Sequence, residues 1–198
     1  MKNEKEKTAE KIKNAAVDEF LKNGYSKASL RKICQSAGVT TGAMYFSFES
    51  KEALFKAIFE PLIRQYEELL RKYMRMELEE PDKGVQLDLF MMQFILEHRK
   101  EAIIILDKAE GSCYEDYRLK VEGMMEQSFK AFYGSKLESL PDDKLIKILA
   151  KIRLDGCIEI IKGNYDMEDS MYLAEKIGIY STGGTEKLIQ NLKELHSN

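Results

Sequence analysis

The chain has 198 residues, of which 44% are hydrophobic and 33% charged, with 12 Gly, 3 Pro and a formal net charge of −3. This length fits one domain or two small ones and is sufficient to bury a core. Few Gly and Pro and many Lys, Glu, Leu, Ile, Met and Ala exclude collagen-like, disordered and sheet-rich classes. We therefore predict an all-α protein.

The cysteines and the apolar runs indicate where in the cell the protein is located. Cys34, Cys113 and Cys157 are widely spaced and give neither a disulfide framework nor a zinc-ligand pattern. The first ten residues are rich in Lys and Glu, unlike a signal peptide. The longest apolar run, 102–106, is far shorter than the roughly 20 residues that cross a bilayer. We expect a soluble cytoplasmic protein with no metal, no cofactor and no membrane partner.

Charge is distributed unevenly along the chain. Residues 1–60 hold 11 Lys and Arg against 8 Asp and Glu, whereas the remaining residues hold 20 against 26. The acidic total argues against a general nucleic-acid coat protein, but a basic N-terminal segment still permits local phosphate binding. The asymmetry is modest, and a solvated helix face is the usual explanation of a difference of this size.

Apolar periodicity predicts a first helix over 8–22. Ile12, Ala16 and Phe20 are in register on one face of it. Asn23-Gly24 is a typical helix stop, because both residues adopt the left-handed conformation readily.

Two short helices follow. Ser29 is placed to cap a helix over 30–37, which Gly38 ends. After a turn of about three residues, Thr40 can cap a third helix over 41–46. Two short helices joined by a Gly-containing turn, with a supporting helix before them, are typical of a helix-turn-helix unit.

Helices continue through the rest of the chain. Ser50 caps a fourth helix, in which Pro61 predicts a kink or a break, since proline lacks a backbone N–H. A loop is predicted at 79–84. Further helices are predicted at 85–97, 99–109, 114–133, 142–162 and 168–194, with Gly183-Gly184 breaking the last of them.

The predicted third helix has the composition that sequence-specific DNA recognition requires. A recognition helix must expose small or polar residues to lie against base edges in the major groove, and Thr41, Gly42 and Ala43 meet that need. Helices that begin at Ser29 and at Ser50-Lys51 can hold phosphates at their N-termini.

The stretch from Gly38 to Leu54, which includes Tyr45, Phe48 and Ser50-Lys51-Glu52, resembles the signature of tetracycline-repressor-type (TetR family) transcriptional regulators, as does the run from Phe20 to Ile33. The resemblance implies a helix-turn-helix DNA-binding domain over 1–60 and a helical-bundle effector-binding and dimerisation domain over 61–198. It also implies DNA contacts from several residues. With the small residues of the third helix added, the expected set is Ser29, Thr40, Thr41, Gly42, Ala43, Tyr45 and Lys51.

Structural roles compete at some of these positions. Phe48 is expected in the core, and Thr40 is expected to be a cap first and a DNA contact second. Tyr45 and Lys51 are interpreted as phosphate contacts, although the alternatives are a core aromatic and an ordinary surface lysine.

Aromatic residues and methionines cluster in the later helices. Their spacing of three and four makes them core faces by default, but the family precedent is a ligand cavity between such helices. His98 could orient a ligand, although a helix C-terminal histidine is the more frequent role. We predict that some of the following residues line a pocket for a small apolar or aromatic effector: Tyr66, Met91, Phe94, Ile95, His98, Tyr117, Met124, Met125 and Phe129.

The last two helices carry a possible dimer interface. An isologous four-helix contact could be built from Leu145, Leu149, Ile152, Gly156 and Ile160 with Tyr172, Ile177, Tyr180 and Leu188. It is nearly as good an interpretation that the same residues pack within the core of one chain.

Together these patterns predict a ligand-responsive transcriptional regulator, a repressor in the first instance, that binds a palindromic operator as a homodimer. The Pro61 region is a candidate joint between the domains. An enzyme is disfavoured because the chain has no recognisable phosphate loop, nucleophile–base arrangement or metal-ligand spacing. The alternative is a helical small-molecule-binding or adaptor protein that does not bind DNA.

Overall fold

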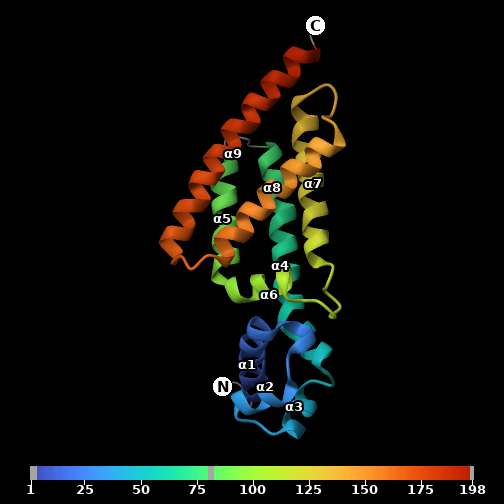
Figure 1. The fold of residues 1–198 in the computed structure, drawn as a ribbon, viewed down its shortest axis with the longest axis vertical. Coiled ribbons are helices and arrows are strands. Elements are labelled where there is room, and N and C mark those ends of the chain that lie inside the picture. Colours follow the sequence, from blue (N-terminus) through green and yellow to red (C-terminus); the bar gives the residue numbers. More distant parts are fainter. Residues whose placement is uncertain (1–3, 80–82, 197–198) are drawn as a thin grey trace. The chain divides into compact units, whose positions relative to one another are not determined.

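A computed structural model describes residues 4–79 and 83–196, and within these residues it contains nine helices and no strand (Figure 1). This confirms the predicted all-α class. No helix in the described ranges is long and apolar enough to cross a membrane. The helices are α1 (Glu4–Lys27), α2 (Leu30–Ala37), α3 (Thr41–Ser47), α4 (Lys51–Glu79), α5 (Gly84–Glu97), α6 (Arg99–Asp107), α7 (Tyr117–Lys136), α8 (Asp143–Lys162) and α9 (Met167–His196).

The predicted stop at Gly24 is confirmed. Gly24 has φ 72° and ψ 163°, outside the helical region, and one further turn follows it to Lys27. Such a φ is accessible to glycine without strain, whereas a side chain would oppose it. Part of the predicted 79–84 loop lies outside the described residues.

The helix breaks predicted at Pro61 and at Gly183-Gly184 are wrong, whereas the alternative of a kink at Pro61 stays a prediction. Pro61 lies inside α4, and Gly183-Gly184 lies inside α9, and both helices continue through these residues. Pro61, Gly183 and Gly184 are all exposed. Water can therefore reach the carbonyl that the proline N–H would have bonded, and the absent glycine side chains leave no gap in the core. The cost of about 1 kcal/mol for each glycine is too small to interrupt a helix that is held on both sides.

The chain packs as two compact units. The first comprises Met1–Glu67 and Lys100–Arg118, and the second comprises Glu68–Arg99 and Leu119–Asn198. Most of α6 therefore belongs with the N-terminal helices. The division of function at residue 60 stays a prediction.

The first unit is built around aromatic rings. α1 packs against α2 and α3, and the predicted register is confirmed because Ile12, Ala16 and Phe20 are completely buried. The ring of Phe55 from α4 lies 5.0 Å from Phe20 and 4.8 Å from Tyr25, measured between ring centroids. These edge-on contacts hold α1 and α4 together.

Residues from α6 and the turn after it complete the first unit. The Lys100 ammonium lies 2.8 Å from the Asp18 carboxylate of α1. The Tyr25 backbone N–H donates to the Lys108 carbonyl at 2.8 Å. The bond satisfies a donor at the point where Gly24 interrupts α1.

In the second unit, α5 and α8 both pack against α9. Buried apolar residues recur about every four residues along α8, as one helix face requires: Ile146, Ala150, Leu154, Ile158 and Ile161. The Arg99 guanidinium holds the connection from α8 to α9. It donates to the carbonyls of Gly163 and Tyr165 at 3.1 and 2.7 Å and to the hydroxyl of Ser170, a fully buried residue, at 2.6 Å.

Candidate nucleic-acid interface

The start and the end of α2 are both defined by the residues predicted to define them. The Ser29 hydroxyl accepts a long hydrogen bond of 3.5 Å from the Lys32 N–H. Gly38 has φ 65° and ψ 34°, the left-handed conformation that glycine favours at a helix end, and its N–H is bonded to the last turn. The chain therefore turns directly after an eight-residue helix.

The short helix α3 begins at Thr40, whose hydroxyl accepts from the Ala43 N–H at 3.1 Å. The predicted cap is confirmed, while a DNA contact from the same residue stays a prediction. Completely buried Met44 and largely buried Phe48 anchor the helix in the first unit. The predicted core position of Phe48 is confirmed.

The opposite face of α3 is open. Thr41, Gly42, Tyr45 and Phe46 are exposed, and Ala43 is half-buried. At 3.6 residues per turn, the exposed positions form one continuous strip along the helix. The small groups of Thr41 and Gly42 let a partner approach the backbone of α3 closely, and the half-exposed Tyr45 places a hydroxyl beside them.

Lys51, at the start of α4, has a structural role that the sequence did not predict, while its contact with phosphate stays a prediction. Its ammonium donates to the carbonyls of Tyr25, Ser26 and Ala28 at 2.7, 3.2 and 3.4 Å. It also lies 4.5 Å from the centroid of the Tyr25 ring. Burial lowers the pKa of Lys51 from its ordinary value. An ammonium has three N–H donors, so a phosphate contact requires Lys51 to exchange or share one of these bonds.

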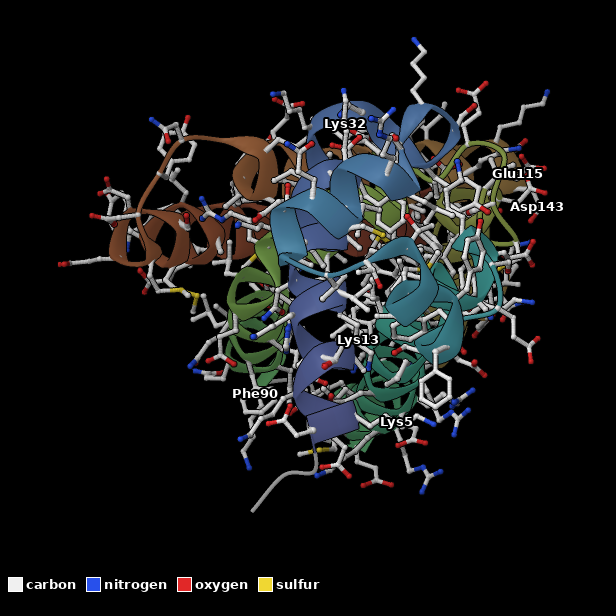
Figure 2. All side chains as sticks on the ribbon, turned by 90° about the horizontal axis from the view of Figure 1, so that it is seen from below. Lys5, Lys13, Lys32, Phe90, Glu115 and Asp143 are labelled. Atoms are coloured by element: carbon white, nitrogen blue, oxygen red, sulfur yellow. The ribbon has the colours of Figure 1, made fainter. Side chains whose placement is uncertain are left out.

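Further cations are exposed on the first unit, and one of them lies against the open strip. Arg31 and Lys32 are exposed on α2, and Figure 2 labels Lys32 there and Lys5 at the N-terminal end of α1. The Lys5 ammonium lies 4.8 Å from the centroid of the Phe46 ring. Lys5 and Phe46 were not among the predicted site residues. The spacing of Phe46 from Gly42 could have shown its exposure, but only the folded chain shows that Lys5 is near.

All seven predicted DNA-binding residues lie in the first unit, and their contacts with DNA stay a prediction: Ser29, Thr40, Thr41, Gly42, Ala43, Tyr45 and Lys51. Two capped short helices, a glycine turn and an exposed strip with small residues define the helix-turn-helix class of DNA-binding fold.

The predicted effector residues are divided between the units. Tyr66 and Tyr117 belong to the first unit, where burial and the Glu67 carboxylate raise the pKa of Tyr117. The remaining residues are half-buried and belong to the second unit: Met91, Phe94, Ile95, His98, Met124, Met125 and Phe129. His98 ends α5, and its ring lies 5.1 Å from that of Phe94. His98 therefore occupies a helix C-terminal position, and a ligand role for it stays a prediction.

Comparison with known proteins gives consistent results. Residues 12–58 match the model of the family described as bacterial regulatory proteins, tetR family. The HTH-type transcriptional regulator UidR of Escherichia coli strain K12 is 33% identical over 116 residues, which are 56% of this chain and 55% of UidR. The chain thus aligns with only about half the length of this relative.

Solved structures support the fold of nearly the whole chain. A regulatory protein of the tetR family from Rhodococcus RHA1 has a TM-score of 0.63 at 17% identity and covers 88% of this chain and 95% of its own. A transcriptional regulator from Aquifex aeolicus VF5 has a TM-score of 0.57 at 22% identity and covers 91% and 99%. Residues 12–58 are thus similar to the tetR family of bacterial regulatory proteins, and the solved structures show that the fold of nearly the whole chain is of the same kind.

Proposed function

We propose that this protein regulates transcription in the cytoplasm by binding a palindromic DNA operator as a homodimer, and that a small apolar or aromatic effector releases it. The main support is the exposed strip of α3 in the segment that matches the family model. The relative UidR is named as a transcriptional regulator. A regulator, and not an enzyme, is therefore the function we assign.

In the proposed complex α3 lies in the major groove. Thr41, Gly42 and Ala43 face base edges, while the Tyr45 hydroxyl and the N-termini of α2 and α4 hold the phosphate backbone on either side. Two copies related by a two-fold axis would enter successive major grooves about 34–36 Å apart.

The dimer is proposed to form through α8 and α9. Ile152 is 63% exposed on α8, and Tyr180 is 82% exposed on α9. Both belong to the predicted interface, and large exposed apolar side chains favour burial against a second copy. Ile160 of the same predicted face is buried within the second unit, so it supports the monomer core instead.

Effector release requires that the effector binds two states of the protein with different affinity. The half-buried Met91, Phe94, Met125 and Phe129 of the second unit offer adaptable apolar contacts. We propose that some of them contact the effector.

DNA binding is tested by selecting duplexes from a random library with the wild-type protein. On a selected duplex, Tyr45→Phe and Lys51→Ala should each weaken binding for all sequences. Lys51→Ala, which removes a positive charge, should also lower the slope of log affinity against log salt by about 1. Lys147→Ala, a change of an exposed lysine on α8, is the control. Unchanged affinity in both variants, together with an unchanged slope in Lys51→Ala, contradicts the phosphate contacts.

The dimer is tested by sedimentation. Ile152→Glu combined with Tyr180→Glu should yield monomers and reduce operator affinity, whereas Leu119→Glu, at an equally exposed leucine of α7, should not. A wild-type protein that sediments as a monomer contradicts the proposed interface.

The effector is tested with a panel of small aromatic and apolar compounds. A compound that binds the folded protein should raise Tm and lower operator affinity. Compounds that raise Tm, together with a protein that selects no duplex, would instead support the alternative of a small-molecule-binding or adaptor protein.

A further inference from the structure

Phe46 is an anomaly on α3. Its side chain is 74% exposed, although the other large apolar residues of this helix and its C-cap, Met44 and Phe48, are buried. Gly42 lies one helical turn before Phe46 and contributes no side chain to cover the ring. The ring is thus presented to solvent on the strip that carries Thr41 and Tyr45.

A cation from another helix lies against this ring. The ammonium of Lys5, in the first turns of α1, is 4.8 Å from the centroid of the Phe46 ring. A cation over an aromatic face is attracted by the electrons of that face. This contact limits the directions that the ring can take, and it places a positive charge beside the proposed groove-facing strip.

A thymine beside the phosphate backbone is the partner that suits the Phe46 ring and the Lys5 ammonium. Its C5 methyl is the apolar group of the major groove, and apolar side chains including Phe are suited to contact it. The phosphate backbone borders the groove, where an ammonium is favoured.

We infer that Phe46 reads a thymine in each operator half-site through its methyl group, and that Lys5 positions the ring and neutralises a neighbouring phosphate. The inference rests on the proposed DNA-binding function and adds two residues to it. Phe46 contributes sequence preference, and Lys5 contributes affinity for any sequence.

The first test leaves the protein unchanged. In the duplex selected by the wild-type chain, each thymine is replaced in turn by deoxyuridine, which lacks only the methyl group. One position in each half-site should lower affinity by about fourfold, the factor that corresponds to burying one methyl group. Equal affinity at every replaced position overturns the inference.

The second test assigns that methyl to Phe46. Phe46→Ala should bind the thymine and deoxyuridine duplexes equally, and a new selection with this variant should lose the preference at that position. Phe90→Ala is the matched control, since Phe90 is a 51% exposed phenylalanine of α5 in the second unit. Undiminished sensitivity to deoxyuridine in Phe46→Ala overturns the assignment.

The third test separates Lys5 from Phe46. Lys5→Gln should keep the selected sequence and reduce the salt slope by about 1, whereas Lys147→Gln should change neither. An unchanged slope overturns the role of Lys5. A wild-type protein that selects no duplex refutes the proposed function itself, whereas a selected duplex without a methyl effect refutes only the role of Phe46.

Discussion

The two units of this protein are stabilised in different ways. In the first unit, α2 and α3 have eight and seven residues, too few for a helix to be stable alone in water. They depend on hydroxyl caps and on packing against buried aromatic rings. In the second unit, α8 has 20 residues and α9 has 30, and many apolar side chains remain partly or largely exposed. Caps and ring packing therefore fix the short helices of the first unit, whereas the long helices of the second unit keep apolar side chains exposed.

The similarity to known proteins follows the same division. The family model matches residues 12–58, which lie in the first unit, whereas solved structures extend the likeness to most of the chain at 17–22% identity. If this difference holds, the stability of the first unit depends on helix caps and on its core of aromatic rings, whereas that of the second unit depends on contacts between residues far apart in the sequence.

Phe55→Ala should have the largest effect. The completely buried ring contacts Phe20, Tyr25 and Phe59, so its removal should lower the free energy of unfolding by about 3–5 kcal/mol. Urea unfolding followed by circular dichroism measures this. A loss below about 1 kcal/mol would mean that the ring core does not hold the first unit together.

Arg99→Ala should be next, and it acts in the second unit. Three acceptors, among them the hydroxyl of buried Ser170, lose a charged donor, at an expected cost of about 2–3 kcal/mol. Hydrogen exchange should show faster opening of the start of α9. Arg153→Ala is the comparison on α8, where the guanidinium pairs with Asp88 in the same unit. Equal protection of α9 in wild type and Arg99→Ala would contradict the link.

Gly38→Ala measures the cost of backbone strain in the turn after α2 without a steric clash of the new side chain. A Cβ at this position meets no atom within 4 Å, but φ is 65°, so the variant should lose about 1–2 kcal/mol through the left-handed conformation alone. Gly123→Ala is the control, since Gly123 lies within α7 and also has open space around it. That variant should be neutral or stabilising. If both changes have the same effect, the turn does not depend on φ.

Tyr117→Phe tests burial of a titratable group through pH. Burial raises the Tyr117 pKa above its ordinary value of 10.0, so the folded state keeps its proton while the unfolded state loses it. Stability from this group is fully present below pH 10 and is lost as pH rises. The wild type should lose about 1.4 kcal/mol more than the variant per pH unit above 10. Parallel pH profiles of unfolding would show that the hydroxyl is not buried.

Thr40→Ala should have the smallest effect on stability. It removes the cap bond to Ala43, and the expected cost is about 1 kcal/mol. Thr40→Ser keeps the hydroxyl and should retain most of the stability, as measured by thermal unfolding. If the serine variant loses as much as the alanine variant, the methyl group and not the cap stabilises α3.

The locally encoded features of the first unit could be predicted from the sequence. Ser29, Gly38 and Thr40 bond to residues three or four positions away, and the spacing of Ile12, Ala16 and Phe20 indicates one helix face. The helix-turn-helix and its open strip followed from these signals.

Features that depend on residues distant in the sequence could not be predicted. The Lys51 ammonium donates to carbonyls 23 to 26 residues earlier, and Lys5 of α1 contacts the Phe46 ring of α3. The breaks expected at Pro61 and Gly183-Gly184 failed for a related reason. Local propensity gives the cost of such residues, but cooperativity of the long helix around them decides the outcome.

The three carbonyls that Lys51 engages have an electrostatic consequence for the first unit. The carbonyl end of a helix carries partial negative charge, which would repel a polyanion at close range. The Lys51 ammonium compensates for that charge within the protein itself. In the proposed DNA complex, Lys51 would therefore make the end of α1 compatible with a nearby phosphate backbone even while its three donors bond to carbonyls of the protein.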